Sequence, residues 1–326
     1  MRELTAGKGG GNAGNGRAVA PGGPWRRIDF MRYRLWSAVC SFVLLVAAIG
    51  SLAVNGLNLG IDFTGGTLVE VRYLEPVSPG VVREVLDGSE FRGAAVQPFG
   101  TPRELLIRVP PNAGPGGDKA LLSERLLTVL RAGGREIEMR RVEFVGPQVG
   151  EELTRAGALA VLYALGGILV YVSLRFQFRF SLGAIAALVH DVLIVLGFFS
   201  FTRMDFDLSV LAALLAVVGY SLNDTIVIFD RLRERFRHMI KATPVEVINT
   251  SLNQTLRRTL VTSLTTLLVL FALFLLGGEI IRAFSVALIV GVLIGTYSSI
   301  YVASAVTLAL GVSRQDLVPA EKEGAP

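Results

Sequence analysis

One acidic residue, Asp224, lies inside a long apolar segment and is the first candidate for chemistry. It is the only charged residue between Leu208 and Phe229, and Asn223 directly precedes it. A carboxylate near the centre of a bilayer costs roughly 2.5–3.5 kcal/mol on insertion scales, so such residues are rare and usually handle a proton or an ion. A structural, salt-bridged carboxylate is the alternative.

Arg258 is the candidate partner cation for Asp224. It precedes another apolar segment, and Thr262 and Thr266 follow at intervals of four residues, on the same face of a helix. This polar stripe could line a wet path between helices. The alternative is an arginine that extends to the membrane surface, above two threonines bonded to their own helix. A carboxylate whose cation can approach and withdraw has two states, ionised and paired or protonated and alone.

His190 and Asp191 form a second ionisable pair within an apolar segment. Adjacent residues on a helix point about 100° apart, so we expect the two side chains to face different neighbours. One would support the segment that contains Asp224, and the other would meet solvent. A structural hydrogen-bonding role and a proton-relay role are both open.

The composition indicates a polytopic membrane protein. Of 326 residues, 52% are hydrophobic and only 18% are charged, which is too apolar for a soluble domain of this length. Cys40 is the one cysteine, which excludes an internal disulfide and a cysteine-based metal site. Segments long enough to span about 30 Å of hydrocarbon as helices are found six times. These predicted spans are 35–57, 156–174, 180–202, 208–229, 259–278 and one drawn from 283–313.

Arginine and lysine residues predict that both termini are cytoplasmic. They gather before the first span, between the second and third spans, and in the segment after the fourth. The net charge of +5 is therefore an orientation signal rather than a nucleic-acid-binding surface. The expected divisions are a flexible tail over 1–34, span one over 35–57, an extracytoplasmic domain over 58–152, spans two to six over 153–313 with a cytoplasmic loop over 230–257, and a cytoplasmic tail over 314–326.

Within the cytoplasmic loop, two short helices are predicted. The first continues the fourth span as a charged, amphipathic segment that Pro244 ends. The second passes through Ile248 and Leu252, before the fifth span begins at Thr259.

The segment 58–152 has the pattern of a small α+β domain. It contains no histidine or cysteine, and its acids are scattered, so a binding or docking domain is expected rather than a hydrolase. The order β-α-β-β-α-β is typical of a ferredoxin-like fold. The predicted strands are 67–74, 94–98, 105–109 and 136–145, and the predicted helices are 79–87, with Ser78 as N-cap, and 119–132.

Gly65 and Gly66 follow Asp62 directly after the first span. Two adjacent glycines permit backbone angles closed to other residues, which predicts a sharp turn from the membrane helix into the first strand. A structural elbow is the main interpretation of these three residues, and contact with a partner or substrate is the alternative.

Five phrases, in order, resemble the SecF family, the smaller membrane subunits of the SecDF complex of bacterial protein export. Each phrase alone is moderately specific, but the ordered set within six spans is highly specific. The phrases are GIDFTGG at 60–66, VGPQVG at 145–150, His190-Asp191, LNDTIVIFDR at 222–231, and SLNQTL at 251–256 followed by Arg258-Thr259.

The resemblance implies a six-helix half of a resistance-nodulation-division unit in the bacterial cytoplasmic membrane. Such a half pairs with SecD, which supplies the other six spans. The resemblance implies that the pair uses the proton-motive force to help preproteins cross the membrane, after their transfer through the SecYEG channel. Asp224 and Arg258 match the family's essential aspartate and arginine, and 58–152 matches its smaller periplasmic domain. The resemblance implies no enzyme activity, no cofactor and no metal.

Two other classes of protein fit the sequence less well. A small-molecule exporter of the same architecture usually has twelve spans and much larger outside domains. An intramembrane aspartyl protease would use Asp191 and Asp224, but the Gly-x-Gly-Asp run of that class is absent.

Overall fold

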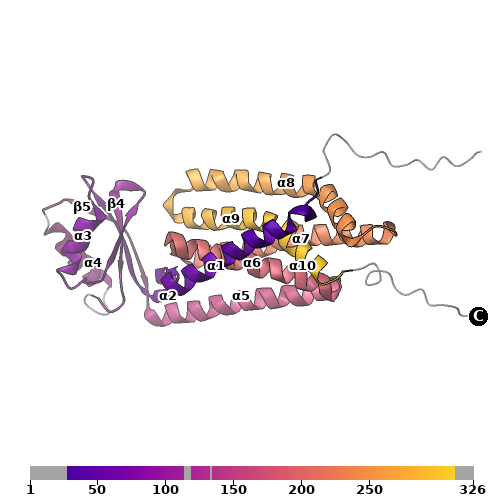
Figure 1. The fold of residues 1–326 in the computed structure, drawn as a ribbon. Coiled ribbons are helices and arrows are strands. Elements are labelled where there is room, and N and C mark those ends of the chain that lie inside the picture. The colour runs from indigo at the N-terminus through magenta and orange to yellow at the C-terminus, as the bar shows by residue number, and fades with distance from the viewer. Residues whose placement is uncertain (1–27, 114–118, 133, 313–326) are drawn as a thin grey trace, which may run out of the picture.

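The protein consists of a bundle of long helices with a small sheet domain at one end (Figure 1). The computed structural model describes residues 28–113, 119–132 and 134–312. The tail predicted over 314–326, and most of the one predicted over 1–34, lie outside the described residues.

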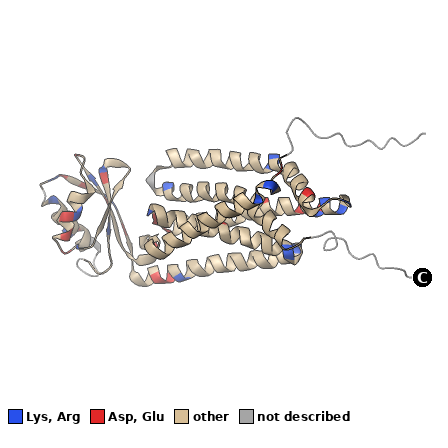
Figure 2. Cartoon of the chain, in the orientation of Figure 1, with Lys and Arg blue, Asp and Glu red and all other residues tan. Residues whose placement is uncertain are grey.

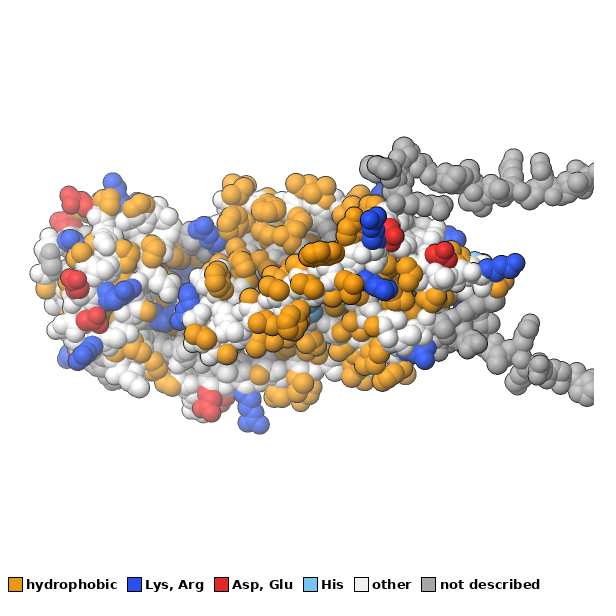
Figure 3. Space-filling model, in the orientation of Figure 1, with side chains coloured by type: hydrophobic (Ala, Val, Ile, Leu, Met, Phe, Trp, Pro, Cys, Tyr) orange, Lys and Arg blue, Asp and Glu red, His pale blue; other side chains and the backbone are white. Residues whose placement is uncertain are grey.

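Six helices of the described residues are long and apolar enough to cross a membrane, which confirms the predicted number of spans. Their outer surface is largely hydrophobic (Figure 3), and charged residues concentrate towards the two ends of the bundle and in the sheet domain (Figure 2). The six are α1 (Arg34–Asn55), α5 (Pro147–Arg175), α6 (Phe178–Thr202), α7 (Leu208–His238), α8 (Pro244–Leu276) and a last span that runs from α9 (Gly278–Ser298) through a π-helical segment (Ser299–Ala303) to α10 (Ser304–Ala309).

Helix α8 corrects the prediction of a separate short helix before the fifth span, because it is continuous from Pro244 to Leu276. Its start is fixed by a capping box, in which Thr243 Oγ1 accepts from the Glu246 amide and Glu246 Oε2 accepts from the Thr243 amide. Proline is well tolerated at the first helical position, and neither glycine nor proline follows before Leu276. The polar first half of α8 and its apolar second half are therefore one rod.

Residues 28–33, predicted as part of a flexible tail, lie against α8 instead. Asn253 holds the backbone of Ile28 on both sides, accepting from its amide at 2.9 Å and donating to its carbonyl at 2.7 Å. Asn249 accepts from the Met31 amide at 3.0 Å. The amide side chains of α8 thus satisfy backbone groups that a free tail would leave to water.

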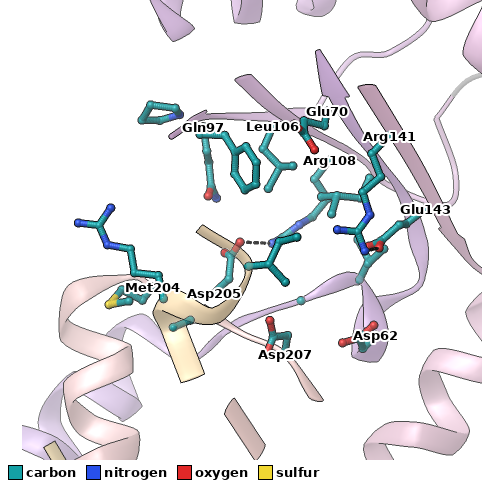
Figure 4. Close-up of a pocket in the computed structure, with 18 of the residues that line it drawn as sticks. Asp62, Glu70, Gln97, Leu106, Arg108, Arg141, Glu143, Met204, Asp205 and Asp207 are labelled. Carbon is teal, nitrogen blue, oxygen red and sulfur yellow. Dashed lines mark ion pairs between the residues drawn. The ribbon is translucent and has the colours of Figure 1, made fainter. Parts of the chain in front are cut away.

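The sheet domain contains four antiparallel strands in the order β3-β4-β2-β5. Alternate side chains of β2 and β4, such as Val69, Val71 and Ile107, are buried in a core shared with the two helices. The opposite face of the sheet carries Glu70 and Arg108 and looks towards the helix bundle (Figure 4). The elements are β2 (Gly66–Tyr73), α3 (Pro79–Asp87), β3 (Ala95–Phe99), β4 (Thr101–Val109), α4 (Lys119–Arg131) and β5 (Ile137–Val145).

A second, two-stranded sheet, which was not predicted from the sequence, joins the domain to the bundle. β1 (Asn58–Leu59) follows α1, and β6 (Asp205–Phe206) directly precedes α7. The two strands pair in parallel, with Asn58 opposite Asp205 and Leu59 opposite Phe206. Each strand has only two residues, which is too short for period-two alternation to be recognised.

The predicted elbow at Gly65 and Gly66 is confirmed, and its geometry requires both glycines. After the short helix α2 (Ile61–Thr64), φ is +69° at Gly65 and +120° at Gly66. A Cβ atom at Gly65 would lie 2.9 Å from Pro147 Cα, and one at Gly66 would lie 2.6 Å from the Val109 carbonyl oxygen. The chain therefore turns where α2, the start of α5 and the end of β4 meet.

We predict that Gly66→Ala destabilises the protein by about 1–3 kcal/mol. A Cβ strains the backbone at this positive φ, and the Val109 carbonyl oxygen must move away from it. Thermal unfolding in mild detergent measures the loss. Gly146→Ala is the matched control. The φ angle of Gly146 is −66°, which any residue can adopt, and a Cβ there would meet nothing within 4 Å. Equal melting temperatures for the two variants would contradict this account of the elbow.

A second prediction concerns Tyr73 at the end of β2. Burial raises the pKa of its phenol from 10.0 to about 12, partly opposed by the charge of Arg135. Because the folded state holds this proton more tightly, the associated stability is complete below pH 10 and is lost as the pH rises towards 12. The free energy of unfolding should therefore fall over this range in the parent chain and fall less in Tyr73→Phe. Identical alkaline profiles would show that the phenol is not buried.

Candidate functional site

Asp224 lies on α7 in the interior of the bundle, with 3% of its surface exposed. Its Oδ2 atom is buried and has no hydrogen-bond partner among the described residues. Close approach of α9 makes this position tight, since a Cβ at Gly295 would lie 3.1 Å from Ser221 Cβ, one turn before Asp224. One oxygen of the carboxylate is therefore removed from water without a hydrogen bond in exchange.

Helix α8 brings a second buried polar atom without a partner to the same level. α7 and α8 are antiparallel neighbours, and the Tyr220 hydroxyl donates to Ser263 Oγ at 3.3 Å. One turn further from the sheet domain are Asp224 on α7 and Thr259 on α8. Thr259 Oγ1 also lacks a hydrogen-bond partner. Two buried polar atoms without hydrogen-bond partners among the described residues thus lie at the same level of α7 and α8.

Arg258 lies next to Thr259, is exposed, and forms no ion pair with Asp224 in the part of the chain that the structure describes. The hydroxyl of Thr262 donates to the Arg258 carbonyl at 3.0 Å, and that of Thr266 donates to the Thr262 carbonyl at 2.9 Å. The threonines of the stripe are therefore bonded to their own helix, as the structural alternative expected.

Asp191 on α6 has the opposite environment from Asp224, although it is equally buried. Its Oδ1 lies 2.9 Å from His190 Nδ1, and its Oδ2 accepts from the hydroxyls of Ser221 at 2.6 Å and Ser298 at 2.7 Å. This carboxylate ties α6 to α7 and α9. The predicted support of the Asp224 segment is thus present.

The expectation that His190 and Asp191 face different neighbours, one of them solvent, is wrong. The two side chains bond to each other, and 3% and 1% of their side-chain surfaces are exposed. Buried polar groups in apolar surroundings are satisfied by one another when water is excluded. The far nitrogen of the imidazole, Nε2, has no partner among the described residues, and the ring lies 6.1 Å from that of Tyr297.

Tyr297 extends this polar cluster to α1, and sequence reasoning missed it. Its hydroxyl donates to the Ser37 carbonyl at 2.7 Å and lies 2.9 Å from Ser41 Oγ. The π-helical segment begins two residues later, at Ser299. The run of Tyr297, Ser298 and Ser299 within an otherwise apolar span was the available signal.

Asp62 of the elbow contacts the beginning of α7. Its Oδ2 accepts from the Leu208 amide at 3.0 Å, beside the N-cap Asp207, which accepts from the Val210 amide at 2.9 Å. Both carboxylates lie where the helix dipole favours negative charge. The structure thus brings Asp62 to the beginning of the helix that carries Asp224 in its middle.

The remaining predicted site residue, Asn223, is exposed on the surface of α7. Arg258, Thr262 and Thr266 lie on α8, which packs against the helix of Asp224, whereas Asp191, with its neighbour His190, lies on α6 and bonds α7 through Ser221. Within the described ranges, no group of three or more His, Cys, Asp or Glu residues could hold a metal ion.

Comparisons with known proteins find membrane proteins of protein export. The family model for the C-terminal part of the protein-export membrane proteins SecD and SecF matches residues 126–313, and the SecD/SecF GG-motif model matches 50–76. The protein translocase subunit SecF of Vibrio alginolyticus is 50% identical over 303 residues, covering 92% of this chain and 96% of that protein. That of Pseudomonas aeruginosa is 50% identical over 294 residues, covering 90% and 94%.

Solved structures show the same likeness. The crystal structure of SecDF from Thermus thermophilus, described as a translocon-associated membrane protein, has a TM-score of 0.79 and 39% identity over 87% of this chain. A structure of SecDF in a super-membrane-facing form has a TM-score of 0.65 and 40% identity over 88%. This chain spans 39% of each of those longer chains. With half-identical relatives matched along nearly their whole length, the chain belongs to the SecF family of protein translocase subunits.

Proposed function

We propose that this chain works with SecD as one half of a SecDF complex, and that the complex uses the proton-motive force to promote late stages of preprotein translocation through SecYEG. Two observations support the partnership. The relatives are named translocase subunits. The chain spans only 39% of the solved SecDF chain, so a partner such as SecD would supply the remaining part of the complex. The activity is that of a transport subunit rather than of an enzyme.

The proposed location is the bacterial cytoplasmic membrane, with the sheet domain outside and both termini inside. Lysine and arginine residues are frequent at the end of the bundle away from the sheet domain (Figure 2). The strand order β3-β4-β2-β5, with α3 and α4 contributing to one core, supports a ferredoxin-like description of the outside domain. The six spans are proposed to be half of a resistance-nodulation-division unit.

The main support for a proton-binding site at Asp224 is the contrast between two buried carboxylates. Asp191 accepts hydrogen bonds at both oxygens, whereas Asp224 Oδ2 accepts none among the described residues. A buried charge without compensation is costly, and either protonation or a closer cation relieves that cost. Asp224 is therefore the group whose state changes, and Arg258 is the cation that can approach it.

Membrane energy is sufficient to drive such a change. One elementary charge that crosses 100 mV gains about 2.3 kcal/mol, which shifts a two-state equilibrium by more than tenfold. Protonation of Asp224 removes its attraction to Arg258, and ionisation restores it. The packing of α7 against α8 would alternate with the proton, while Asn223, Thr262 and Thr266 border the path.

We predict that Asp224→Asn, an isosteric change that cannot ionise, lowers proton-driven export stimulation at least tenfold. The measurement is preprotein uptake by energised inverted membrane vesicles containing SecYEG and the complex with SecD. Asp230→Asn is the matched control, because Asp230 lies on the same helix but is half exposed and pairs with Arg175 at 2.8 Å. Full stimulation by Asp224→Asn would end the proposal of proton coupling at this site.

His190 and Asp191 are proposed to support α7 rather than to relay protons. Ser298→Ala then lowers stability by about 1.5–3 kcal/mol, because a hydrogen bond to a buried charge is lost. Proton flux through the complex should stay within about twofold of the parent. Ser299→Ala is the control, since that hydroxyl donates to the Thr296 carbonyl of its own helix. Lost flux at unchanged melting temperature would instead favour a relay.

A further inference from the structure

The sheet domain and the bundle enclose a cavity of about 460 Å³ where they meet. The open face of the sheet forms one wall, and the segment that precedes α7, the start of α2 and the first turns of α9 form the other (Figure 4). One ion pair crosses this junction directly, between Arg108 on β4 and Asp205 on β6, with an Nη2–Oδ2 distance of 2.8 Å.

This ion pair is partly buried and is supported by further hydrogen bonds, unlike an exposed ion pair on a protein surface. The Arg108 and Asp205 side chains are only 17% and 24% exposed. Arg108 Nη1 also donates to the Leu59 carbonyl at 2.9 Å, and Asn58 Nδ2 donates to Asp205 Oδ1. Surface ion pairs contribute little, but a partly buried pair with additional hydrogen bonds is costly to break.

The pair is attached to the helix that carries Asp224. Asp205 is three residues before α7, and Asp62 of the elbow bonds the first amide of that helix. α7 is continuous over 31 residues and contains no proline. Asp224 lies about 24 Å along the helix from Leu208, at 1.5 Å per residue. A displacement of α7 near Asp224 is therefore carried to the junction by a stiff rod.

A second attachment holds the domain to a different helix. The Thr154 hydroxyl of α5 donates to the Phe63 carbonyl at 3.2 Å, and a Cβ at Gly150 would lie 2.8 Å from the Gly65 amide nitrogen. The elbow is thus held by α5 and, through Asp62, by the start of α7, whereas the sheet itself is bound through Arg108 to the segment that leads into α7. When α7 moves relative to α5, the sheet domain is therefore pulled through Arg108 while α5 retains the elbow.

We propose that Arg108 and Asp205 are coupling residues, through which movement of α7 turns the sheet domain. This inference rests on the proposed function, since it assigns the step between proton passage at Asp224 and work outside the membrane. Neither residue touches the proton or the preprotein in this scheme, so both act by positioning.

The test is charge exchange in the complex with SecD, reconstituted with SecYEG. We expect Arg108→Glu and Asp205→Arg each to lower export stimulation at least fivefold, while Asp224-dependent proton flux stays within twofold of the parent. The double variant re-forms the pair in reverse and should recover at least half of the stimulation. Partial recovery is expected because the bonds to Leu59 and Asn58 are not rebuilt.

Arg141→Glu is the matched control. Arg141 lines the same cavity from β5, but it pairs with Glu143 of its own strand, so its reversal leaves the junction intact. Export should remain within twofold of the parent. Expression level and monodispersity in detergent identify variants that fail to fold.

The outcomes separate this inference from the proposed function. Normal export by both single variants would overturn the coupling role, as would loss of export and flux together without recovery in the double variant. Absence of Asp224-dependent flux in the parent complex would refute the proposed function instead. Recovery of export by the double variant would still assign the ion pair to translocation in that case.

Discussion

The structure depends on how a helix bundle in hydrocarbon compensates the negative charge of a carboxylate. Two carboxylates occupy the interior, within 3% exposure, and their compensation differs. Asp191 is bonded by three side chains from α6, α7 and α9, which makes it a fixed junction of the bundle. Asp224, on α7, keeps an oxygen without a hydrogen-bond partner in the part of the chain that the structure describes. One carboxylate stabilises the packing, and the other leaves it dependent on a proton.

The position of α7 connects this difference to the rest of the molecule. The helix is held by Asp191 through Ser221 near its middle, and by Asp62 and the β1–β6 pair at its beginning. The glycine elbow then sets how the chain leaves the membrane and enters the sheet. The paired glycines are thus conformational requirements at the point where α2, α5 and β4 approach within contact distance.

Much of this architecture could be predicted from local pattern. Apolar length predicted six spans, and the adjacent glycines predicted the elbow. Pro79 predicted the start of α3 correctly. What could not be predicted depends on contacts distant in sequence. Three features join segments that are 30 or more positions apart in the sequence. They are the two-residue β1–β6 pair, the Ser221 and Ser298 donors to Asp191, and the binding of Ile28 by Asn253. The continuity of α8 was missed because the change from polar to apolar sequence near Thr259 was interpreted as the start of a separate span, although neither glycine nor proline interrupts the helix there.

The central claim is that Asp224 takes up and releases a proton while Arg258 changes its distance from it. Infrared difference spectroscopy of the complex with SecD, between acidic and alkaline buffers, tests this directly. The account predicts a protonated carboxyl stretching band that appears at the acidic end, disappears at the alkaline end, and is absent from Asp224→Asn. A carboxylate that stays ionised across the whole range, with spectra identical to those of Asp224→Asn, would contradict it.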